Sequence, residues 1–202
     1  MSRWQQWPRE RWQALLEKRG VASAGAERLG GFLHILGRFT AAMDLVAPVD
    51  AEVLVKHHLE ESLAAEPWLR HCRRVLDVGS GNGFPVIPLL CACPQLTAVL
   101  LEPRERRWAF LREVVRELEL PADVVRERLK EHRGGGYDAA TVRAVGLREW
   151  ATELPVRLVV GGLVVWWRGP GEAEGLAGEG VVLSPLPDQR RGTLVVWRPC
   201  ST

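Results

Sequence analysis

A glycine-rich stretch in the first half of the chain limits the possible folds more than any other feature. Residues 75–88 read VLDVGSGNGFPVIP, where Gly79, Gly81 and Gly83 follow a hydrophobic run and precede Phe84. Glycines at such a point let the backbone take positive φ and approach a ligand closely. The stretch therefore predicts a short buried strand, a bare loop and the start of a helix.

Strand-like and helix-like segments alternate from residue 74 onward. This alternation predicts a doubly wound, Rossmann-like α/β sheet, whose ligands lie at the carboxyl ends of the strands. Strands are expected at 75–79, 96–102, 122–127, 137–142 and 163–167, helices at 85–93, 103–120 and 147–160, a loop at 169–180, and a terminal hairpin from 181–185 and 193–197. In the helix over 103–120, the expected apolar stripe is Trp108, Leu111, Val115 and Leu118.

The first 70 residues carry helical periodicity without strands. Helices are expected from Trp4 to Arg19, from about Ala26 onward, and from Ala51 to Ala65, with Asp50 as the N-cap of the last. We therefore expect a helical extension over residues 1–70, packed on a core domain over residues 71–202.

Composition excludes several classes of protein. With 47% hydrophobic residues the chain can bury a core, and a net charge of +2 is too small to announce a nucleic-acid binder. The four cysteines form no CxxC pair and no histidine cluster completes a zinc set, so no metal site is expected. With so few cysteines, a reduced cytoplasmic setting is expected. No apolar run approaches the roughly 20 residues that a bilayer span needs.

Two acidic residues accompany the glycine loop. Asp77 lies two residues before Gly79, and Glu102 ends the second expected strand, 23 residues after Gly79. An acid at that second position can accept hydrogen bonds from both hydroxyls of a ribose. Together with the loop, Glu102 indicates a ligand that contains adenosine.

The loop departs from the GxGxxG pattern of dinucleotide sites. Phe84 stands where the third glycine would be, and Pro85 removes a backbone donor that a pyrophosphate would use. S-adenosylmethionine, which lacks a pyrophosphate, fits better. The alternative is a glycine turn that merely joins a strand to a helix, and the position of Glu102 disfavours it.

The string VLDVGSGNGFPVIPL resembles the signature of the ribosomal RNA small subunit methyltransferase G family (RsmG, also GidB), which typically reads LDVGSGxGFPGIPL. The similarity extends to residues 52–57, 100–120, 137–145 and 161–169. Members of that family use S-adenosylmethionine to methylate N7 of a guanine in 16S rRNA. The resemblance implies a class I S-adenosylmethionine-dependent methyltransferase fold. It also implies 16S rRNA of the small ribosomal subunit as partner, no membrane, and a cytoplasmic monomer.

The residues after the fourth strand agree with that reaction. They read TVRAVG, without the Asn/Asp-Pro-Pro-aromatic motif of enzymes that methylate exocyclic amines. No cysteine stands at the end of the fourth or fifth strand, where an enzyme for pyrimidine carbon 5 needs its nucleophile. Guanine N7 carries no proton, so orientation and electrostatics can suffice without a general base.

The resemblance also implies the site residues. The catalytic candidates are Arg143, Arg168, which replaces a family lysine, and one of two histidines. Matching EVLVKH selects His57, whereas aligning ESLA without a gap selects His58. Glu127 is a substitute for the family acid that is Lys130 here. The cofactor candidates follow the strands: Asp77, Gly79, Ser80, Gly81, Gly83, Phe84, Glu102, Glu127, Arg128 and Arg143.

Two departures from the family pattern keep other functions open. An asparagine of the family is Asp44 here, and the serine before the family arginine is Val142; both lie in regions that are expected to face substrate. The alternatives are a non-catalytic rRNA-binding paralogue, and a methyltransferase that acts on another RNA or a small molecule. Arg104, Arg106 and Arg107 form either an RNA-facing patch or a solvated first turn of a helix.

Overall fold

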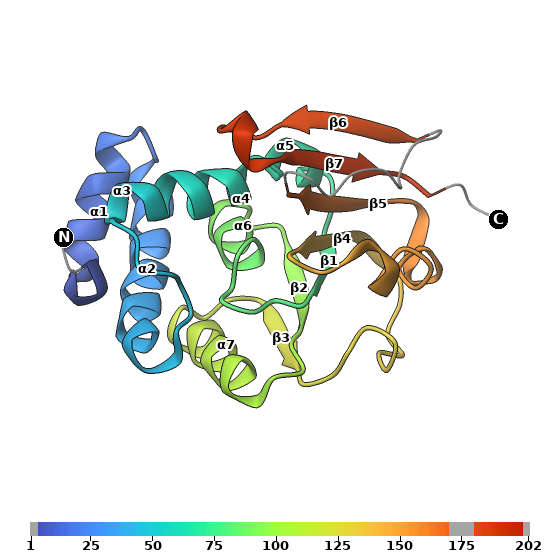
Figure 1. Cartoon of the computed structure of the whole chain (residues 1–202), viewed down its shortest axis with the longest axis horizontal. Helices are drawn as coiled ribbons and strands as arrows, with labels where there is room; N and C mark the ends of the chain where they lie inside the picture. The colour runs from blue at the N-terminus through green and yellow to red at the C-terminus, as the bar shows by residue number, and fades with distance from the viewer. Residues whose placement is uncertain (1–3, 170–179, 200–202) are drawn as a thin grey trace.

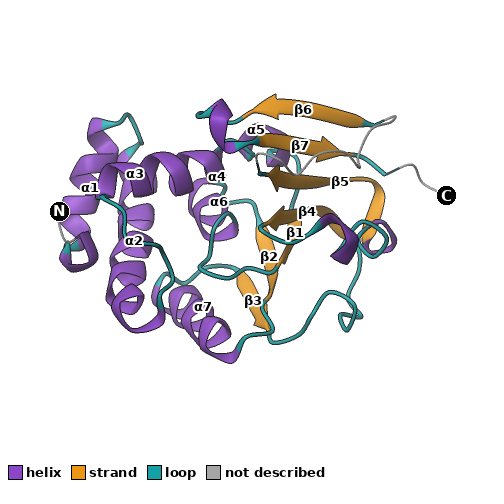
Figure 2. Cartoon of the chain, in the orientation of Figure 1, coloured by secondary structure: helices purple, strands orange, loops and turns teal. Residues whose placement is uncertain are grey.

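One seven-stranded sheet forms the centre of the protein (Figures 1 and 2). The computed structural model describes residues 4–169 and 180–199, apart from the side chains of Ala41 and Gln189. The strand order is β3-β2-β1-β4-β5-β7-β6, and the first five strands of this order run parallel. The strands are β1 (Arg74–Val78), β2 (Thr97–Leu101), β3 (Ala122–Val125), β4 (Tyr137–Arg143), β5 (Leu158–Arg168), β6 (Val181–Pro185) and β7 (Thr193–Trp197). The predicted doubly wound α/β sheet is confirmed.

The chain order reverses beside β1, which pairs with β2 on one side and β4 on the other. Such a switch point leaves a crevice at the carboxyl ends of the strands, because the connections leave in opposite directions. The predicted terminal hairpin is also confirmed, since β6 and β7 pair antiparallel and β7 joins β5. The expected loop over 169–180 lies almost entirely outside the described residues.

Most helices of the first 70 residues stand at one side of the sheet, next to the helices α6 (Val86–Ala92) and α7 (Glu105–Glu117) (Figure 1). Asp50 is the N-cap that the sequence predicts, because its side chain accepts a hydrogen bond of 2.8 Å from Val53 N. The helical elements are η1 (Trp4–Gln6), α1 (Arg9–Lys18), α2 (Ser23–Met43), α3 (Ala51–Leu54), the π-helix η2 (Val55–Glu60), α4 (Glu61–Leu63), α5 (Glu66–Leu69), α6 (Val86–Ala92), α7 (Glu105–Glu117), η3 (Leu147–Glu149), η4 (Pro155–Arg157) and η5 (Gln189–Arg191). None of those in the described ranges combines the length and hydrophobicity that a bilayer span requires.

Two expected helices are wrong in extent. The helix expected over Trp4–Arg19 is divided into η1 and α1, because Pro8 stands between them and has no N–H to donate. The helix expected over 147–160 is replaced by η3, η4 and the start of β5. Pro155 interrupts it, and the register of β4 against β5 shifts between Tyr137–Leu158 and Ala139–Leu163. Gly161 and Gly162 therefore lie inside a bulged strand rather than in a turn before it.

The buried face of α7 is also rotated from the expected stripe. Phe110, Leu111 and Val114 are buried, whereas Trp108, Val115 and Leu118 are only partly so. The reason lies in the extension, because the Phe110 ring packs edge-on against Phe39 of α2 at 5.5 Å. A helix in contact with both a sheet and a second helix buries a wider face than its own sequence indicates.

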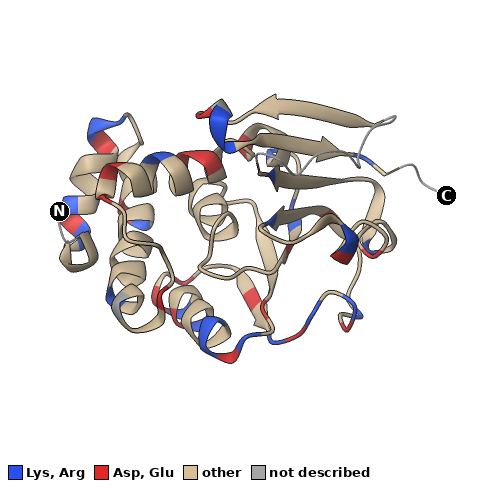
Figure 3. Cartoon of the chain, viewed as in Figure 1, with Lys and Arg blue, Asp and Glu red and all other residues tan. Residues whose placement is uncertain are grey.

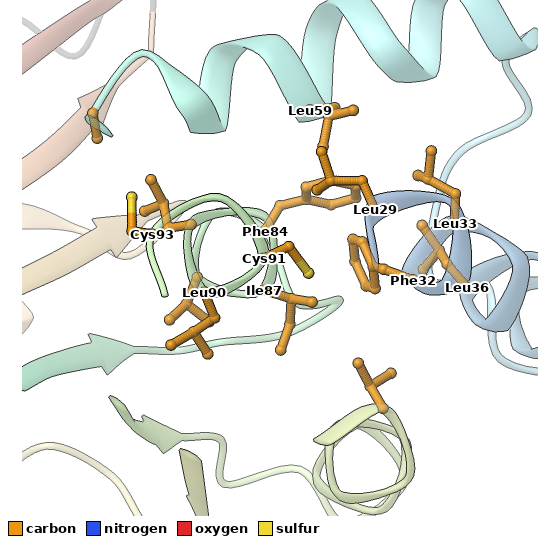
Figure 4. Packing of buried hydrophobic residues seen from close by; sticks show 14 of the residues in the cluster. Leu29, Phe32, Leu33, Leu36, Leu59, Phe84, Ile87, Leu90, Cys91 and Cys93 are labelled. Carbon is orange, nitrogen blue, oxygen red and sulfur yellow. The ribbon is translucent and has the colours of Figure 1, made fainter. Parts of the chain in front are cut away.

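The helical extension and the glycine loop share one core. Phe32 of α2 is fully buried, and its ring meets Phe84 edge-on at 5.1 Å (Figure 4). Gly83, with φ of 89°, makes this packing possible. A Cβ atom there would lie 2.9 Å from Ile87 Cγ1 and 3.2 Å from the Phe32 ring. The third glycine of the loop therefore serves packing rather than ligand approach.

We predict that Phe32→Ala destabilises the whole protein by about 3–5 kcal/mol, because a cavity replaces a buried ring. The measurement is the free energy of unfolding from chemical denaturation. Val156→Ala, at a side chain that is 79% exposed, is the control and should change it by less than about 0.5 kcal/mol. A loss below about 1 kcal/mol for Phe32→Ala would show that α2 does not stabilise the sheet.

Candidate active site

A cavity of about 660 Å³ lies at the carboxyl ends of β1, β2 and β4. This is the position that the strand order predicts for a ligand, and the volume is ordinary for a small-molecule site. Its wall takes residues from the glycine loop, from the ends of β2 and β3, from the segment after β4, and from the π-helix η2. Elements far apart in the sequence therefore converge on one site.

The glycine loop is tied to the end of β2. The backbone N–H groups of Gly79 and Ser80 both donate to Leu101 O, at 2.9 and 3.0 Å. Gly79 has φ of 70°, and a Cβ atom there would lie 2.7 Å from Val145 Cγ2, so only glycine fits. Of the predicted loop residues, Gly79, Ser80, Gly81 and Phe84 line the cavity and Gly83 does not.

Glu102 has the geometry expected of a residue that binds a ribose. Its carboxylate is 3% exposed, and its two oxygens accept from Gly81 N at 2.9 Å and from Arg104 N at 2.8 Å. Each carboxylate oxygen can accept a further hydrogen bond. Because both backbone donors fix the carboxylate, its remaining lone pairs are held in place for two hydroxyls of a ligand in the cavity. These acceptors therefore fit the two ribose hydroxyls of S-adenosylmethionine.

Asp77 lies behind the glycine loop and does not line the cavity. Thr141 Oγ1 donates to its Oδ1 at 2.6 Å, and no described residue donates to its buried Oδ2. Burial raises the pKa of the Asp77 carboxyl to about 6, with a smaller contribution in the same direction from the nearby charge of Glu102. Asp77 is thus a buried acid that supports the loop from beneath.

Glu127 and Arg128 follow β3 and line the cavity, as predicted. Glu127 is held there by His132, whose Nδ1 contacts the carboxylate and whose Nε2 lies 2.7 Å from the Tyr137 hydroxyl. Sequence reasoning missed His132 and Tyr137. A short loop that returns a histidine to the preceding acid leaves no periodic pattern to detect.

Arg143 ends β4 and lines the cavity with a side chain that is 16% exposed. It donates to the Glu61 carboxylate at 2.6 Å and to His57 O at 3.0 Å. Burial lowers the pKa of the Arg143 guanidinium, and the Glu61 carboxylate acts in the opposite direction. Glu61, which sequence reasoning missed, is 2% exposed although an acid on a helix is ordinarily solvated.

The structure distinguishes the two candidate histidines. His58 lines the cavity with its ring 5.2 Å from that of Phe84, whereas His57 lies outside the lining, with its Nε2 3.7 Å from Asp188. Burial lowers the pKa of His58 to about 4, helped by the charges of Arg143, Arg191 and His57. Arg168 ends β5 in register with Thr193 and does not line the cavity. Arg143 and His58 are therefore the two catalytic candidates that the cavity brings together.

Neither departure from the family pattern alters the cavity wall directly. Val142 lies beside the cavity-lining residues Arg143 and Ala144, but its own side chain is fully buried in the core cluster that includes Leu76 and Val78. Asp44 is exposed and caps α2 with φ of 49°, a left-handed conformation that asparagine and aspartate both adopt readily. Its neighbour Leu45 lines the cavity.

Basic and acidic side chains alternate around the cavity. Arg104, Arg107 and Lys130 line it together with Glu149, whereas Arg106 donates to Ala42 O at the end of α2. Figure 3 shows Lys and Arg beside Asp and Glu at the start of α7 and in the loop after β3. Of the three arginines after Glu102, Arg104 and Arg107 thus belong to the cavity wall and Arg106 contacts the extension, so an RNA-facing patch stays a prediction for the two in the wall.

Comparison with known proteins identifies relatives. The family described as rRNA small subunit methyltransferase G matches residues 26–179. The chain is 40% identical over 143 residues to the ribosomal RNA small subunit methyltransferase G of Mycobacterium avium (strain 104), covering 67% of this chain and 57% of that protein. It is 34% identical over 128 residues to the protein of that name from Coxiella burnetii (strain RSA 493 / Nine Mile phase I), covering 62% of each. The matched part spans less than two thirds of these two relatives.

Solved structures agree on the fold. An RNA methyltransferase from Salinibacter ruber, in complex with S-adenosyl-L-homocysteine, superposes with a TM-score of 0.55 at 18% identity, covering 77% of this chain and 95% of that one. A SAM-dependent O-methyltransferase from Thermotoga maritima superposes with a TM-score of 0.56 at 13% identity, covering 83% and 72%. The sheet, its switch point and its glycine loop define a class I S-adenosylmethionine-dependent methyltransferase fold. Within that class, the chain belongs to the ribosomal RNA small subunit methyltransferase G family, whose methyl donor is S-adenosylmethionine.

We predict that Asp77→Asn makes the protein relatively more stable as pH rises. The raised pKa means that Asp77 contributes stability below its unfolded value of 3.8, and that this contribution is lost as pH rises through about 6. Asparagine has no proton to lose, so the difference in unfolding free energy between variant and wild type should grow by about 2 kcal/mol from pH 4 to pH 7. Denaturation at both pH values measures it, with Asp123→Asn, on an exposed part of β3, as control. A difference that does not change with pH would contradict the buried ionisation.

We predict that His58 titrates near pH 4 in the folded protein, because burial and neighbouring cations disfavour its charged form. Its contribution to folding stability therefore falls as pH drops from 6.5 towards 4. In this range the imidazole is protonated in the unfolded chain but not in the folded chain. Imidazole NMR signals followed over pH measure the midpoint, with His58→Gln to assign the signal. A midpoint near 6.5 would show that the ring is open to water.

Proposed function

We propose that the protein is a methyltransferase that transfers the methyl group of S-adenosylmethionine to N7 of a guanine in 16S rRNA of the small ribosomal subunit. The observation that carries this proposal is the convergence of the glycine loop, Glu102, His58 and Arg143 on one cavity. Family membership supports the substrate, because the relatives named above are ribosomal RNA small subunit methyltransferases. We further propose that the protein acts in the cytoplasm as a monomer, without a membrane partner.

The cofactor would be held between the glycine loop and the loop after β3. Glu102 would accept from the ribose hydroxyls, Glu127 and Arg128 would border the base, and Phe84 would close the side towards α2. When bound, S-adenosylmethionine supplies an electrophilic methyl group on a positively charged sulfur. The chain's contribution is then to hold the guanine in line with that methyl group and to exclude water.

Arg143 and His58 are suited to orienting a guanine. A guanine that is attacked through N7 must keep that lone pair free, so an arginine can assist only at a neighbouring acceptor such as O6. Arg143 retains an N–H at Nε for which no described residue is the acceptor. His58 is neutral at pH 7 because its pKa is about 4, and its ring lies beside Phe84, where an unstacked base can stack. Since N7 carries no proton, neither residue has to act as a base.

The phosphate backbone of the RNA would be bound by the cations of the cavity rim. Arg104, Arg107 and Lys130 stand at the start of α7 and after β3, at the opening of the cavity. Backbone phosphates are recognised mainly by such charges. The burial of Val142 removes one of the two reasons for a non-catalytic paralogue, so we favour an active enzyme.

The test is methyl transfer from labelled S-adenosylmethionine to small subunits from a strain that lacks its own enzyme of this family, followed by mapping of the labelled base. Label at N7 of a 16S guanine is expected, and Arg143→Ala should lower kcat/KM at least about 100-fold. The control is Arg70→Ala, at an exposed arginine before β1 and thus near the amino ends of the strands, opposite the cavity. Tight cofactor binding without label on rRNA would contradict the proposal and favour the non-catalytic rRNA-binding paralogue. Label on another RNA or on a small molecule would identify that molecule as the substrate instead.

A further inference from the structure

One buried carboxylate joins the cavity to the terminal hairpin. Glu61 accepts from Arg143 Nη2 at 2.6 Å on one oxygen and from Arg191 Nε at 2.7 Å on the other. Its backbone oxygen accepts from Trp167 Nε1 at 2.7 Å. Glu61 follows the π-helix, Arg143 ends β4, and Arg191 lies between β6 and β7. Three segments that are distant in sequence therefore meet at this side chain.

The contacts of Arg143 are unequal around its guanidinium group. Nη2 donates one hydrogen bond to the Glu61 carboxylate and one to His57 O at 3.0 Å. The contacts of Nη1 are long, at 3.5 Å to His58 O and 3.4 Å to Ser62 Oγ. No described residue accepts from Nε. The group is thus fixed firmly at one corner, and the strongest contact there is the charged one to Glu61.

We propose that Glu61 is the positioning residue for Arg143, holding its guanidinium so that the Nε–H, for which no described residue is the acceptor, stays available to a ligand in the cavity. Arg191 completes the arrangement, because it occupies the second carboxylate oxygen and prevents Glu61 from taking both nitrogens of Arg143. Glu61 itself does not line the cavity. The inference rests on the proposed function only in that Arg143 is taken to contact the substrate base.

The chain provides a matched control for this arrangement. Glu117 on α7 also serves two arginines, with Arg9 at 3.2 Å on one oxygen and Arg38 at 2.9 Å on the other. Its side chain is 15% exposed, and none of these three residues lines the cavity. Glu117→Gln therefore removes the same kind of contact away from the cavity, where it can affect stability only.

The first measurement is the Nε–H NMR signal of Arg143, assigned by its absence from Arg143→Ala. A guanidinium held by a carboxylate rotates slowly, so the wild-type signal should be sharp and shifted from that of free arginine. Glu61→Gln should broaden it and move it towards the free position, whereas Glu117→Gln should leave it unchanged. This readout does not depend on turnover or on a loaded site.

The second measurement is the kinetics of methyl transfer to small subunits. Glu61→Gln should lower kcat at least about tenfold and change the KM for subunits less than about threefold, because the rim cations are untouched. Glu117→Gln should change neither. In the Arg143→Ala background, Glu61→Gln should add less than about a twofold effect, because it acts through the residue already removed.

Glu61→Asp covers the case in which Glu61→Gln does not fold. It keeps the charge but withdraws it by one methylene, so the Arg143 signal should lie between the wild-type position and that of free arginine. The value of kcat should lie between those of the wild type and of Arg143→Ala. A folded Glu61 variant with the wild-type Arg143 signal would overturn the inference, as would an additive effect in the Arg143→Ala background. If the wild type transfers no methyl group, the proposed function fails, and the NMR comparison alone still decides whether Glu61 positions Arg143.

Discussion

The contact between Phe32 and the glycine loop is the constraint on which the rest of the site depends. It exists because Gly83 has no side chain, since a Cβ atom there would lie 3.2 Å from the Phe32 ring. The extension is then part of the same core as the sheet. It brings η2 over the carboxyl ends of the strands, and with it His58 and the carbonyl groups that receive Arg143. Without the packing of α2 on the glycine loop, the cavity would keep the wall that the glycine loop forms and lack the wall that η2 forms.

The features that the sequence predicts correctly are those whose chemistry is local. The glycine loop, Glu102 and the segment after β3 are each identified by residues a few positions apart, and the structure places all of them at one cavity. The doubly wound sheet follows from the alternation of strand and helix patterns, which is equally local. A cavity wall that is built from a backbone loop and one acid therefore leaves a pattern that the sequence shows.

The features that the sequence does not predict depend on distant partners. Glu61 reads as an ordinary helix acid until Arg143 and Arg191, both more than 80 positions away, are brought beside it. Which of His57 and His58 lines the cavity depends on how a π-helix presents them, which no periodic pattern encodes. Val142 is different, because strand alternation was enough to place it. If Arg143 faces the cavity, its neighbour in β4 must face the core.

The link between Glu61 and Arg191 has a consequence for the order in which the protein is made. A chain synthesised from its N-terminus contains the extension, the glycine loop and β4 well before it contains residues 188–197. Until residues 188–197 are made and pair with β5, Glu61 has Arg143 but not Arg191 as a partner. The growing chain can thus tie its glycine loop to β2 early, whereas the carboxylate that binds Arg143 gains its second partner only when the hairpin pairs.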